Sequence, residues 1–598
     1  MAFNFEEYIY EIVKSKKKQR VVGFIVLGLL IFAVGMIPMK LVLAKMLPGK
    51  SANTYSIYVD TATNSTIEQT KEVSECVSHI LSKEDAVKNI EVFLGQGAPL
   101  DYAGLVKGSA FKALKSQAEI VINLTDKHTR AEPSYMMVHR LRPIVKSKCE
   151  TLYKNTNIRF VEMPSGPPTF ATIEVNLFGK DSLLLRKTAK TVENSFKETE
   201  GLVDIDVMQD DIYIKYEIIP NVEKIISSSL SVEQVSSILY MAFKGSVVAT
   251  KNSTRQQDQI PIFVSLDHKT RTLDNASQEE LELKFSRLKL LNRMGVMIPV
   301  KEVVDIVPTI ADPTIFKKNM RNMVSITAEC DLVSQVYPLM DAREILIKKL
   351  EKDFTVERLV GASTYMFDLA LVDKKTKEKV LVRWDGEMKV SLDTFRDLGG
   401  AFISALVLMF LLMVVYYKSF ALSGIVLVGS FLSIIGVIIG HYISDFVFLH
   451  FITGVHFYLT ATSLIGFISL MGISARSSLL LIDFTKSLIE SGIEKNRAIA
   501  ISTSTRAKPI LLTAVAIILG SLLLASDPIF GGLGIALIFG SMASTAVSLF
   551  YIPVLMAKTD AICSKNGTLS CKDGEGIDEK NMDVSEIAPE VHHGNEIK

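Results

Sequence analysis

An arginine at membrane depth is the first residue of chemical interest in this chain. Arg476 lies inside the apolar stretch GISARSSLLLIDF, which runs from Gly472 to Phe484. An arginine near the centre of a bilayer costs on the order of 3 kcal/mol, so it usually faces a protein interior or water and pairs with a carboxylate. The acid in the same apolar segment, Asp483, lies on the same helix face but roughly 10 Å further along the axis. No other apolar segment has an Asp or Glu in its interior, so we expect the counter-charge to come from another polypeptide.

Two further residues fit a charge-coupled relay with Arg476. Thr513 lies in the next apolar segment, and Arg506 lies at the entrance of that segment. A hydroxyl beside a guanidinium can exchange hydrogen bonds as a partner carboxylate changes protonation state, but arginine itself does not deprotonate. The titrating acid of such a relay must therefore lie outside this chain. The alternative interpretation is that the Arg476 side chain merely extends to the cytoplasmic interface, which Asp483 and Lys486 would mark.

The elements that must position these residues are apolar runs without Asp, Glu, Lys or Arg. Each is long enough to cross a hydrocarbon core of about 30 Å as a helix. One run precedes a polar region of roughly 350 residues, and five follow it. The fold class we predict is an α+β membrane protein with six transmembrane helices, arranged 1+5 around a large external region. The six runs are Val21 to Met39, Leu398 to Tyr417, Ser419 to Ser444, Phe457 to Ala475, Pro509 to Ser526 and Pro528 to Ala557.

The distribution of basic residues predicts the orientation of these helices. Lysines and an arginine precede the first run, which has no small-residue cleavage site and is therefore expected to be an uncleaved anchor. The basic loop Thr485 to Lys508 falls on the same side, and basic loops stay in the cytoplasm. We expect the following organisation: a cytoplasmic N-terminus at 1–20, a first helix at 21–40, an external region at 41–396, five helices at 397–557, and a disordered cytoplasmic tail at 558–598.

Within the external region the hydrophobic period alternates between that of a strand and that of a helix. Three strand-helix-strand units are predicted, at residues 54–95, 117–163 and 171–208, with the turn PSGPP between the second and the third. Repetition at this scale indicates small α+β subdomains with helices on one face of each sheet. Between about Asp210 and Met297 the order of elements is looser, which is typical of an inserted subdomain.

Several kinds of function are disfavoured by missing motifs. The chain has a net charge of +1 and no basic stripe, so we expect no nucleic-acid partner. It has no nucleotide-binding G-x-x-x-x-G-K-[ST] motif, no H-E-x-x-H and no G-x-S-x-G. We therefore predict neither an enzyme nor an ATP-driven pump, and we expect no cofactor.

Soft metal ligands and cysteines are present but not in a telling pattern. Copper-group metals prefer thioether and imidazole ligands, whereas ordinary packing is the simpler interpretation here, so we predict no metal site. The side chains concerned are Met136, Met137, His139, and the loop histidines His441, His450 and His456. Three external cysteines could supply one disulfide, but their odd number leaves a thiol and the spacing favours no bridge; they are Cys76, Cys149 and Cys330.

The segments themselves resemble a known family of transporters. GISARSSLLLIDFTKSL is similar to the tenth helix of resistance-nodulation-division (RND) efflux permeases, and RAKPILLTAVAIILGSLLL is similar to their eleventh. DPIFGGLGIALIFGSMASTAVSLFYIPVLM resembles the twelfth helix. IYVDTATNSTIEQTKEV and MIPVKEVVDI resemble parts of the porter domain, and GEMKVSLDTFRDLG resembles its return to the membrane. The resemblance extends from about Val21 to Lys558.

This resemblance implies roles for the three residues singled out above. Arg476 matches the basic residue of the family's proton relay, which is usually a lysine. Thr513 matches the eleventh-helix hydroxyl, and Arg506 matches a basic residue near the cytoplasmic proton path. The replacement of lysine by arginine is one departure, since arginine lacks the easier deprotonation of lysine. The paired aspartates of the family's fourth helix are a second departure, because the whole N-terminal half is missing from this sequence.

The chain therefore resembles the C-terminal half of a split or half-length RND pump. The resemblance implies a multi-pass protein of the bacterial inner membrane, with both termini in the cytoplasm and contact with membrane lipids. It also implies a complementary half-subunit that carries the aspartates, trimers of such half-pairs, a periplasmic adaptor and an outer-membrane channel. The expected function is proton-driven export of an unspecified solute.

Two alternatives stay open at this point. One is a Sec-associated accessory half-transporter for protein export, which also has six spans but is expected to have a smaller external region without an insertion. The other is a membrane scaffold that transports nothing, in which Arg476 would only hold two subunits together.

Overall fold

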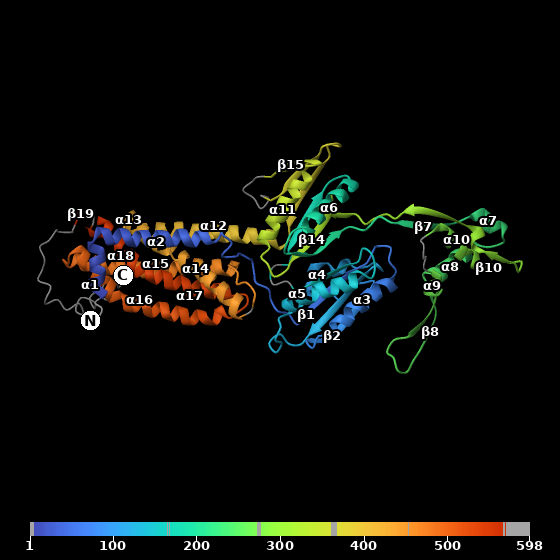
Figure 1. The fold of residues 1–598 in the computed structure, drawn as a ribbon, viewed down its shortest axis with the longest axis horizontal. Helices are drawn as coiled ribbons and strands as arrows, with labels where there is room; N and C mark the ends of the chain where they lie inside the picture. Colours follow the sequence, from blue (N-terminus) through green and yellow to red (C-terminus); the bar gives the residue numbers. More distant parts are fainter. Residues whose placement is uncertain are drawn as a thin grey trace, which may run out of the picture. The chain divides into compact units, whose positions relative to one another are not determined.

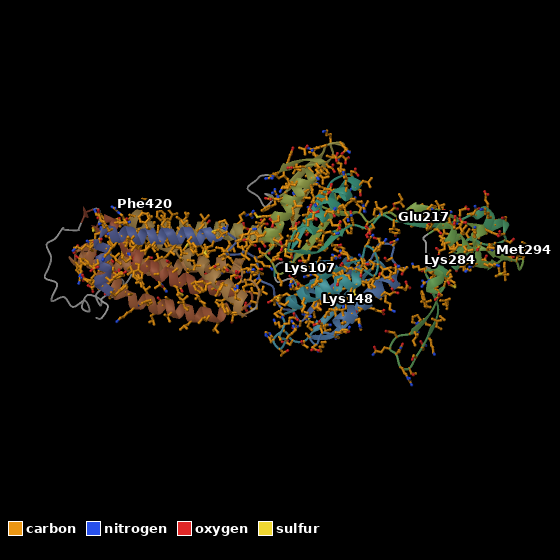
Figure 2. All side chains as sticks on the ribbon, viewed as in Figure 1. Lys107, Lys148, Glu217, Lys284, Met294 and Phe420 are labelled. Carbon is orange, nitrogen blue, oxygen red and sulfur yellow. A yellow bond between two sulfur atoms is a disulfide. The ribbon has the colours of Figure 1, made fainter. Side chains whose placement is uncertain are left out.

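The computed structural model describes residues 5–163, 166, 168–271, 277–359, 367–452, 454–565 and 568–569 (Figure 1). Most of the predicted PSGPP turn, and the predicted disordered tail beyond residue 569, lie outside these residues. The described chain continues past Lys558 with three short elements: the 3-10 helix η6 (Asp560–Cys563) and the strands β18 (Ser564–Lys565) and β19 (Thr568–Leu569). Carbon dominates the side chains of the helix bundle, whereas nitrogen and oxygen are dense over the sheets (Figure 2).

Six helical segments are long and apolar enough to cross a membrane, as the sequence predicts. Two of them are built from shorter helices: α13 and α14 meet at a turn and are followed by the π-helix η4, whereas α17 and α18 are joined through the π-helix η5. The segments are α2 (Lys16–Met36), α12 (Glu387–Tyr417), α13 (Phe420–Phe431) with α14 (Ile434–Val447) and η4 (Phe448–Ile452), α15 (Ala461–Glu490), α16 (Lys495–Ala525), and α17 (Gly531–Ala546) with η5 (Val547–Tyr551) and α18 (Ile552–Lys558).

Helix α15 packs against α12, α13, α16 and α17, and α17 also packs against α14. The contact between α14 and α17 depends on a glycine. A Cβ atom at Gly436 would lie 2.2 Å from the Phe539 carbonyl oxygen, so the two backbones can approach only without it. The N-terminal helix α1 (Phe5–Lys14) packs on α16 through its apolar face, and Glu6 forms an ion pair of 2.9 Å with Arg497.

The first two strand-helix-strand units do not form separate subdomains, contrary to the simplest reading of the sequence. Their strands join one antiparallel sheet in the order β2-β3-β1-β4. Helices α3 and α5 cover the same face, where their apolar side chains share one core. The elements are β1 (Thr54–Asp60), α3 (Ile67–Leu81), β2 (Val87–Leu94), α4 (Tyr102–Lys107), η1 (Ser109–Phe111), β3 (Gln117–Leu124), α5 (Ser134–Val145), η2 (Lys146–Glu150) and β4 (Asn157–Val161). We call residues 54–163 the first sheet domain.

A disulfide joins Cys76 on α3 to Cys149 on η2. The expectation that no bridge forms is therefore wrong. The two cysteines are 73 residues apart in sequence and meet because both helices lie on the same face of the sheet. Only the tertiary arrangement brings them together, whereas Cys330 has a free thiol.

The third predicted unit combines with strands from much later in the chain. They form a seven-stranded sheet with the path β13-β14-β5-β17-β16-β15 and with β6 paired to β14. Helices α6 and α11 cover one face, and α12 follows directly after β17. The elements are β5 (Ile173–Phe178), α6 (Ser182–Lys197), β6 (Leu202–Met208), β13 (Phe316–Lys318), β14 (Arg321–Cys330), α11 (Val336–Leu350), β15 (Phe354–Arg358), β16 (Leu369–Asp373) and β17 (Lys379–Asp385). We call residues 171–208 and 316–385 the second sheet domain.

Residues Gln209–Ile315 form a second compact unit with its own apolar core. This unit interrupts what is otherwise a single strand. β5 occupies one side of β14, and both β6 and β13 pair with its other side: Met208 lies opposite Ser325, and Phe316 lies opposite Met323. One position, opposite Val324, separates the end of β6 from the start of β13. The insertion therefore leaves and re-enters the sheet at nearly the same point.

The inserted unit contains β7 (Ile214–Pro220), α7 (Val222–Ser227), α8 (Val232–Phe243), β8 (Ser246–Lys251), β9 (Ile260–Val264), α9 (His268–Arg271), α10 (Gln278–Arg287), β10 (Lys289–Leu291), β11 (Met297–Pro299), η3 (Val300–Val303) and β12 (Val304–Ile310). Its strands pair two by two, β7 with β12, β8 with β9 and β10 with β11. The region predicted as an insertion, Asp210 to Met297, falls within it.

Candidate functional site

Helix α15 places Arg476 near its midpoint. The helix starts at a capping box in which the Thr460 side chain accepts a hydrogen bond from the Ser463 backbone N–H and the Ser463 hydroxyl accepts one from the Thr460 backbone N–H, so its first turn is fixed. It then continues without a break to Glu490, which lies about 21 Å beyond Arg476 along the axis at 1.5 Å per residue. Asp483 and Lys486, at which the alternative interpretation places the cytoplasmic interface, lie closer, about 10 and 15 Å from Arg476 along the axis, and that interpretation stays open.

One face of α15 is not covered by any helix of the described residues. Five side chains on it are exposed and recur every three or four residues, which places them in one stripe. The other faces are buried against the neighbouring helices. The arginine therefore lies in an open apolar surface. We call this surface the α15 stripe; its residues are Ile465, Ser469, Gly472, Arg476 and Leu480.

Within the described part of the chain, no hydrogen bond or ion pair joins Arg476 to another residue. The acid on the same helix, Asp483, instead accepts a hydrogen bond of 3.4 Å from the Tyr416 hydroxyl on α12. This agrees with the distance argument from the sequence, by which Asp483 lies too far along the axis for a direct pair.

Thr513 is exposed on α16, and its hydroxyl is turned back to its own helix. It donates to the carbonyl oxygens of Pro509 at 3.0 Å and Ile510 at 2.8 Å. Such back-bonding is the usual resting state of a threonine in an apolar helix, because it satisfies the hydroxyl locally. The structure does not bring Thr513 into contact with Arg476.

Arg506 is half-buried on α16, two turns before Thr513, and contacts α15. Its guanidinium carbon lies 4.8 Å from the centre of the Phe484 ring, within the range of a cation–π contact. Its Nε atom is buried and has no hydrogen-bond partner in the described chain. An unsatisfied buried donor costs roughly 1–3 kcal/mol. The three predicted relay residues thus lie on two adjacent helices without touching one another.

A second charged feature, which the sequence gives no sign of, is the contact between the two sheet domains. Every cation in it comes from the first sheet domain and every anion from the second. We call this contact the ionic seam; Lys107 is labelled in Figure 2. Its pairs are Lys107–Glu329 at 2.8 Å, Arg142–Asp204 at 2.9 Å, Arg142–Asp331 at 2.6 Å, Lys146–Asp204 at 3.0 Å and Arg159–Asp206 at 2.7 Å.

Asp204 is the most constrained residue of the seam. Its side chain is only 1% exposed, and it binds both Arg142 and Lys146. Its backbone has φ of +51°, a left-handed conformation that is uncommon outside glycine. It lies where the register of β6 on β14 shifts, and such a bulge redirects a side chain. The bulge thus directs a carboxylate at the first sheet domain.

A buried carboxyl, Glu162, lies beside the seam at the end of the first sheet domain. Burial raises the pKa of Glu162 to about 7, and the nearby Arg142 opposes this rise. The charge of this group therefore changes near neutral pH.

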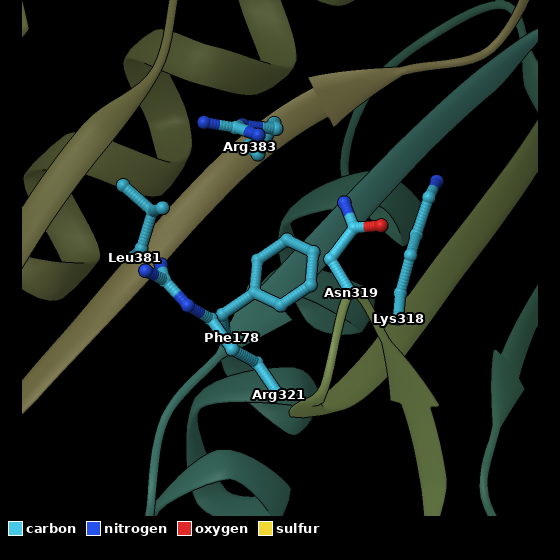
Figure 3. Close-up of a pocket in the computed structure, with 6 residues that line it drawn as sticks. All are labelled: Phe178, Lys318, Asn319, Arg321, Leu381 and Arg383. Carbon is cyan, nitrogen blue, oxygen red and sulfur yellow. The ribbon is translucent and has the colours of Figure 1, made fainter.

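Two cavities open on the face of the seven-stranded sheet that α6 and α11 do not cover. The larger, about 420 Å³, has walls from both sheet domains and includes Phe111, Glu174, Met208, Met323 and Asp385. The smaller, about 270 Å³, is shown in Figure 3. There Lys318, Asn319, Arg321 and Arg383 surround Phe178 and Leu381, while Arg383 pairs with Asp368 at 3.2 Å and Lys318 with Asp385 at 3.0 Å.

The thioether and imidazole side chains considered as metal ligands in the sequence do not meet at one site. His139 Nδ1 lies 2.8 Å from Asp331, Met137 is part of the first sheet domain's core, and His441 is inside α14 rather than in a loop. Among the described residues, no group of three or more His, Cys, Asp or Glu is arranged to hold a metal ion.

Six apolar helices, with two sheet domains and an insertion between the first and the second helix, define a polytopic membrane protein of mixed α and β structure. The chain belongs to the AcrB/AcrD/AcrF family, whose sequence model matches residues 2–560. This confirms the resemblance to RND permeases.

Individual relatives match the chain over part of their length. The swarming motility protein SwrC of Bacillus subtilis (strain 168) is 22% identical over 520 residues, which is 86% of this chain and 43% of that protein. The cobalt-zinc-cadmium resistance protein CzcA of Cupriavidus metallidurans is 32% identical over 102 residues, 16% of this chain and 10% of CzcA. The multidrug export protein AcrF of Escherichia coli (strain K12) is 32% identical over 97 residues, which is 15% of this chain and 9% of AcrF.

The fold also matches a solved structure. The crystal structure of a heavy metal efflux pump superimposes with a TM-score of 0.66 at 15% identity, covering 92% of this chain and 51% of that pump. The chain thus spans about half the length of SwrC and of this pump.

Proposed function

We propose that this chain is one half of a proton-driven RND efflux transporter, corresponding to the C-terminal half of the full-length pumps. A second six-span polypeptide covers the α15 stripe and supplies the titrating aspartates. Proton binding and release at those aspartates alters their pairing with Arg476, and the helices transmit this change to the sheet domains. The chain is thus a subunit of a secondary transporter and not an enzyme.

The observation that carries the proposal is the position of Arg476. A permanent cation lies midway along an apolar helix, on an exposed stripe, with no counter-charge from the described chain. Charges at this depth are normally paired within a protein interior. The stripe also contains Ser469 and Gly472, small residues that allow a second helix to approach closely.

Thr513 and Arg506 complete the relay in this proposal. The Thr513 hydroxyl exchanges its bond to the α16 backbone for one to the partner's carboxylate, since both arrangements satisfy the hydroxyl. Arg506, with its free Nε, accompanies the proton path at the cytoplasmic end. Both roles are supported by the family positions of the two residues and by their location on the helix next to α15.

The assembly and location follow from the family and from the charge distribution. We infer an inner-membrane protein with both termini in the cytoplasm, because the basic residues before α2 and around Arg497 belong on that side. Trimers of half-pairs, a periplasmic adaptor and an outer-membrane channel are the expected partners. The names of the relatives include both metal resistance and multidrug export, so the cargo class is left as an exported solute.

The two alternative functions receive less support. A Sec-associated accessory subunit is expected to lack a separate insertion, whereas this chain has a compact one at Gln209–Ile315. A scaffold would need Arg476 only for assembly. That case is distinguished from the relay by whether loss of the arginine removes the partner or removes transport.

Co-purification tests the half-pump directly. A tagged chain, extracted from its native membranes in mild detergent, should bring down a second six-span polypeptide with adjacent aspartates in its fourth helix. The second chain is identified by mass spectrometry. Recovery of a homo-oligomer that exports solute in exchange for protons without any such partner would contradict the proposal.

Substitution of Arg476 then separates the relay from the scaffold. In the reconstituted pair, Arg476→Ala should abolish proton-coupled export while the partner still co-purifies, because the carboxylates lose their counter-charge. Leu480→Ala is the matched control, since Leu480 lies one turn further along the same exposed stripe and carries no charge. Export that survives Arg476→Ala would exclude the relay, and loss of the partner would favour the scaffold.

A further inference from the structure

A fully buried histidine lies in the helix bundle away from Arg476. His441 on α14 is 0% exposed, and both of its ring nitrogens have partners. Nδ1 lies 2.8 Å from the Val437 carbonyl oxygen, one turn earlier on the same helix, and Nε2 lies 2.8 Å from the Ser463 hydroxyl on α15. A carbonyl only accepts, so Nδ1 carries the hydrogen and Nε2 of the neutral ring accepts from Ser463. An ionisable side chain within a membrane bundle is expensive and is generally functional.

Three hydroxyls continue from this imidazole as one connected chain. The Ser463 hydroxyl lies 3.0 Å from that of Thr460, which lies 2.8 Å from that of Thr462. Thr462 then donates at 3.0 Å to the carbonyl oxygen of Ile529, in the segment between α16 and α17. All three hydroxyl-bearing residues are buried, whereas Asp527, two residues before Ile529, is exposed. This chain of hydroxyls thus links the buried ring to the end of the bundle where α15 and α17 begin.

We propose that His441 is a proton-binding site of the helix bundle, reached from that end through the hydroxyls of Ser463, Thr460 and Thr462. It would be a second protonation site, separate from the pairing of Arg476 with a partner's aspartates. Its effect on export rests on the proposed function, but proton binding itself is a property of this chain alone.

The hydroxyl chain can pass a proton because each member both donates and accepts. With the ring neutral, Ser463 donates to Nε2 and Thr460 donates to Ser463, and the Thr462 hydroxyl turns from the Ile529 carbonyl oxygen to donate to Thr460. A proton taken up from water at the Thr462 end displaces the hydroxyl hydrogens one step each, so that Ser463 gives its hydrogen to Nε2 and receives one from Thr460. The result is an imidazolium that donates to Ser463. Each hydroxyl then donates in the opposite direction, and the last of them, Thr462, donates to the Ile529 carbonyl oxygen. One proton enters, one N–H bond forms, and every hydroxyl keeps one hydrogen.

The surroundings leave the hydroxyl chain as the only polar connection to the ring in the described structure. Below His441 the contacts between α14, α15 and α17 are apolar, through Val437, Phe467, Leu470 and Ala536. The sequence of α17 has no titratable residue, and α15 has none before Arg476. The charged groups on the other elements at this end are Asp445 on α14, His456 in the following loop, Asp527 before α17, and Lys45, whose backbone binds that of Leu459.

Both ring nitrogens are bound by neutral groups, so the site is neutral at rest and binds its proton when the solution at that end is acidic. This is the direction in which a proton gradient drives entry from outside. The resulting charge lies where α14, α15 and α17 meet, and Gly532 of α17 has no room for a Cβ beside Thr460 and Ser463. A small movement of α17 is therefore enough to alter the hydroxyl chain.

Nitrogen NMR on the purified chain tests proton binding without the partner. The chain is labelled with 15N-histidine, placed in lipid nanodiscs and titrated from pH 8 toward acid, with His441→Gln used to assign the signal. The expected result is a neutral Nδ1–H ring that converts to an imidazolium. Ser463→Ala should slow its proton exchange by about tenfold or more, because the relay is cut. A ring that stays neutral until the bundle unfolds, or that exchanges equally fast in Ser463→Ala, overturns the proposal.

Transport by the reconstituted pair gives a second measurement. Glutamine retains the bond to Ser463 but cannot be protonated, so His441→Gln should remove the acid-dependent part of the pH profile of export. His450→Gln is the matched control, because His450 Nδ1 likewise binds the carbonyl oxygen one turn earlier but its side chain is exposed. An unchanged profile in His441→Gln would make the histidine a fixed cross-link. If no export is found in any variant, the half-pump fails while the NMR result still decides the site.

Discussion

At the scale of single residues, the two arginines of the relay are held very differently by this chain. The guanidinium of Arg506 lies over the Phe484 ring, whereas that of Arg476 has no partner in the described residues. Arginine stays charged at any physiological pH, so its environment must supply the neutralising group permanently. Arg506 is thus stabilised within the chain, whereas the described chain supplies no neutralising group for Arg476, as the proposed half-pump expects. This contrast is the strongest single reason to expect a half-pump.

The pKa of Glu162 leads to a prediction about pH and stability. Its ordinary value is near 4.5, and burial raises it to about 7 in the folded chain. Protonation is therefore easier in the folded state, and Glu162 lowers stability as pH rises from 4.5 to 7, with the full cost above that. Glu162→Gln should raise the free energy of unfolding at pH 8 by up to about 3 kcal/mol and leave it unchanged near pH 4.5.

Thermal or denaturant unfolding of the solubilised chain at the two pH values measures this effect. Glu75→Gln is the control, since Glu75 is an exposed glutamate on α3 of the same sheet domain. A gain at both pH values, or an equal gain in the control, would contradict a buried carboxylate as the cause.

At the scale of elements, the two sheet domains are joined by charge and not by a shared apolar core. Their hydrophobic clusters are separate, and the pairs between them all run from cations of the first domain to anions of the second. Buried ion pairs hold a defined geometry but contribute little net free energy, since desolvation offsets much of the attraction. Such a contact can separate and then re-form with the same pairs of residues. The seam is therefore suited to relative movement of the two domains.

Asp204 is the residue whose loss should weaken the seam most. Asp204→Asn removes the carboxylate that Arg142 and Lys146 share and leaves the buried Arg142 with Asp331 as its one remaining acid partner among the described residues, so we expect a loss of about 3 kcal/mol in the free energy of unfolding. The single tryptophan, Trp384, is buried in the second sheet domain, 6.1 Å from Phe196, and its fluorescence reports the transition.

The matched control for the seam is Asp353→Asn. Asp353 pairs with Lys187 at 2.8 Å within the second sheet domain, but both side chains are more than half exposed. Exposed pairs contribute little, so this change should shift the transition only slightly. Similar losses in the two variants would mean that the seam is no more than a surface pairing.

At the scale of the whole molecule, the chain consists of units that join at few points. The insertion Gln209–Ile315 has its own core and interrupts a strand at one position opposite Val324. The second sheet domain ends at β17, and the chain returns from there to the membrane through α12. A protein built in this way can lose the insertion without losing the sheet it interrupts.

This arrangement predicts that the insertion can be removed while the sheet that it interrupts keeps its fold. Replacing Gln209–Ile315 by a single threonine should join β6 to β13 as one continuous strand on β14, because one residue fills the missing position. The shortened chain should enter the membrane and keep the Trp384 emission and unfolding midpoint of the full chain. Aggregation, or exposure of Trp384, would show that the insertion supports the second sheet domain.

The sequence by itself determined the six apolar helices, the strands and helices of the external region, and the residues from which a relay could be built. These features follow from periods of two or 3.6 residues, and a short window of sequence contains them. Only the tertiary structure decided that two strand-helix-strand units share one sheet, that Cys76 meets Cys149, and that His441 lies inside a helix. It also decided that Arg476 is exposed while Arg506 is covered. These outcomes depend on contacts between residues far apart in the chain, and no local pattern records which distant face an element will meet.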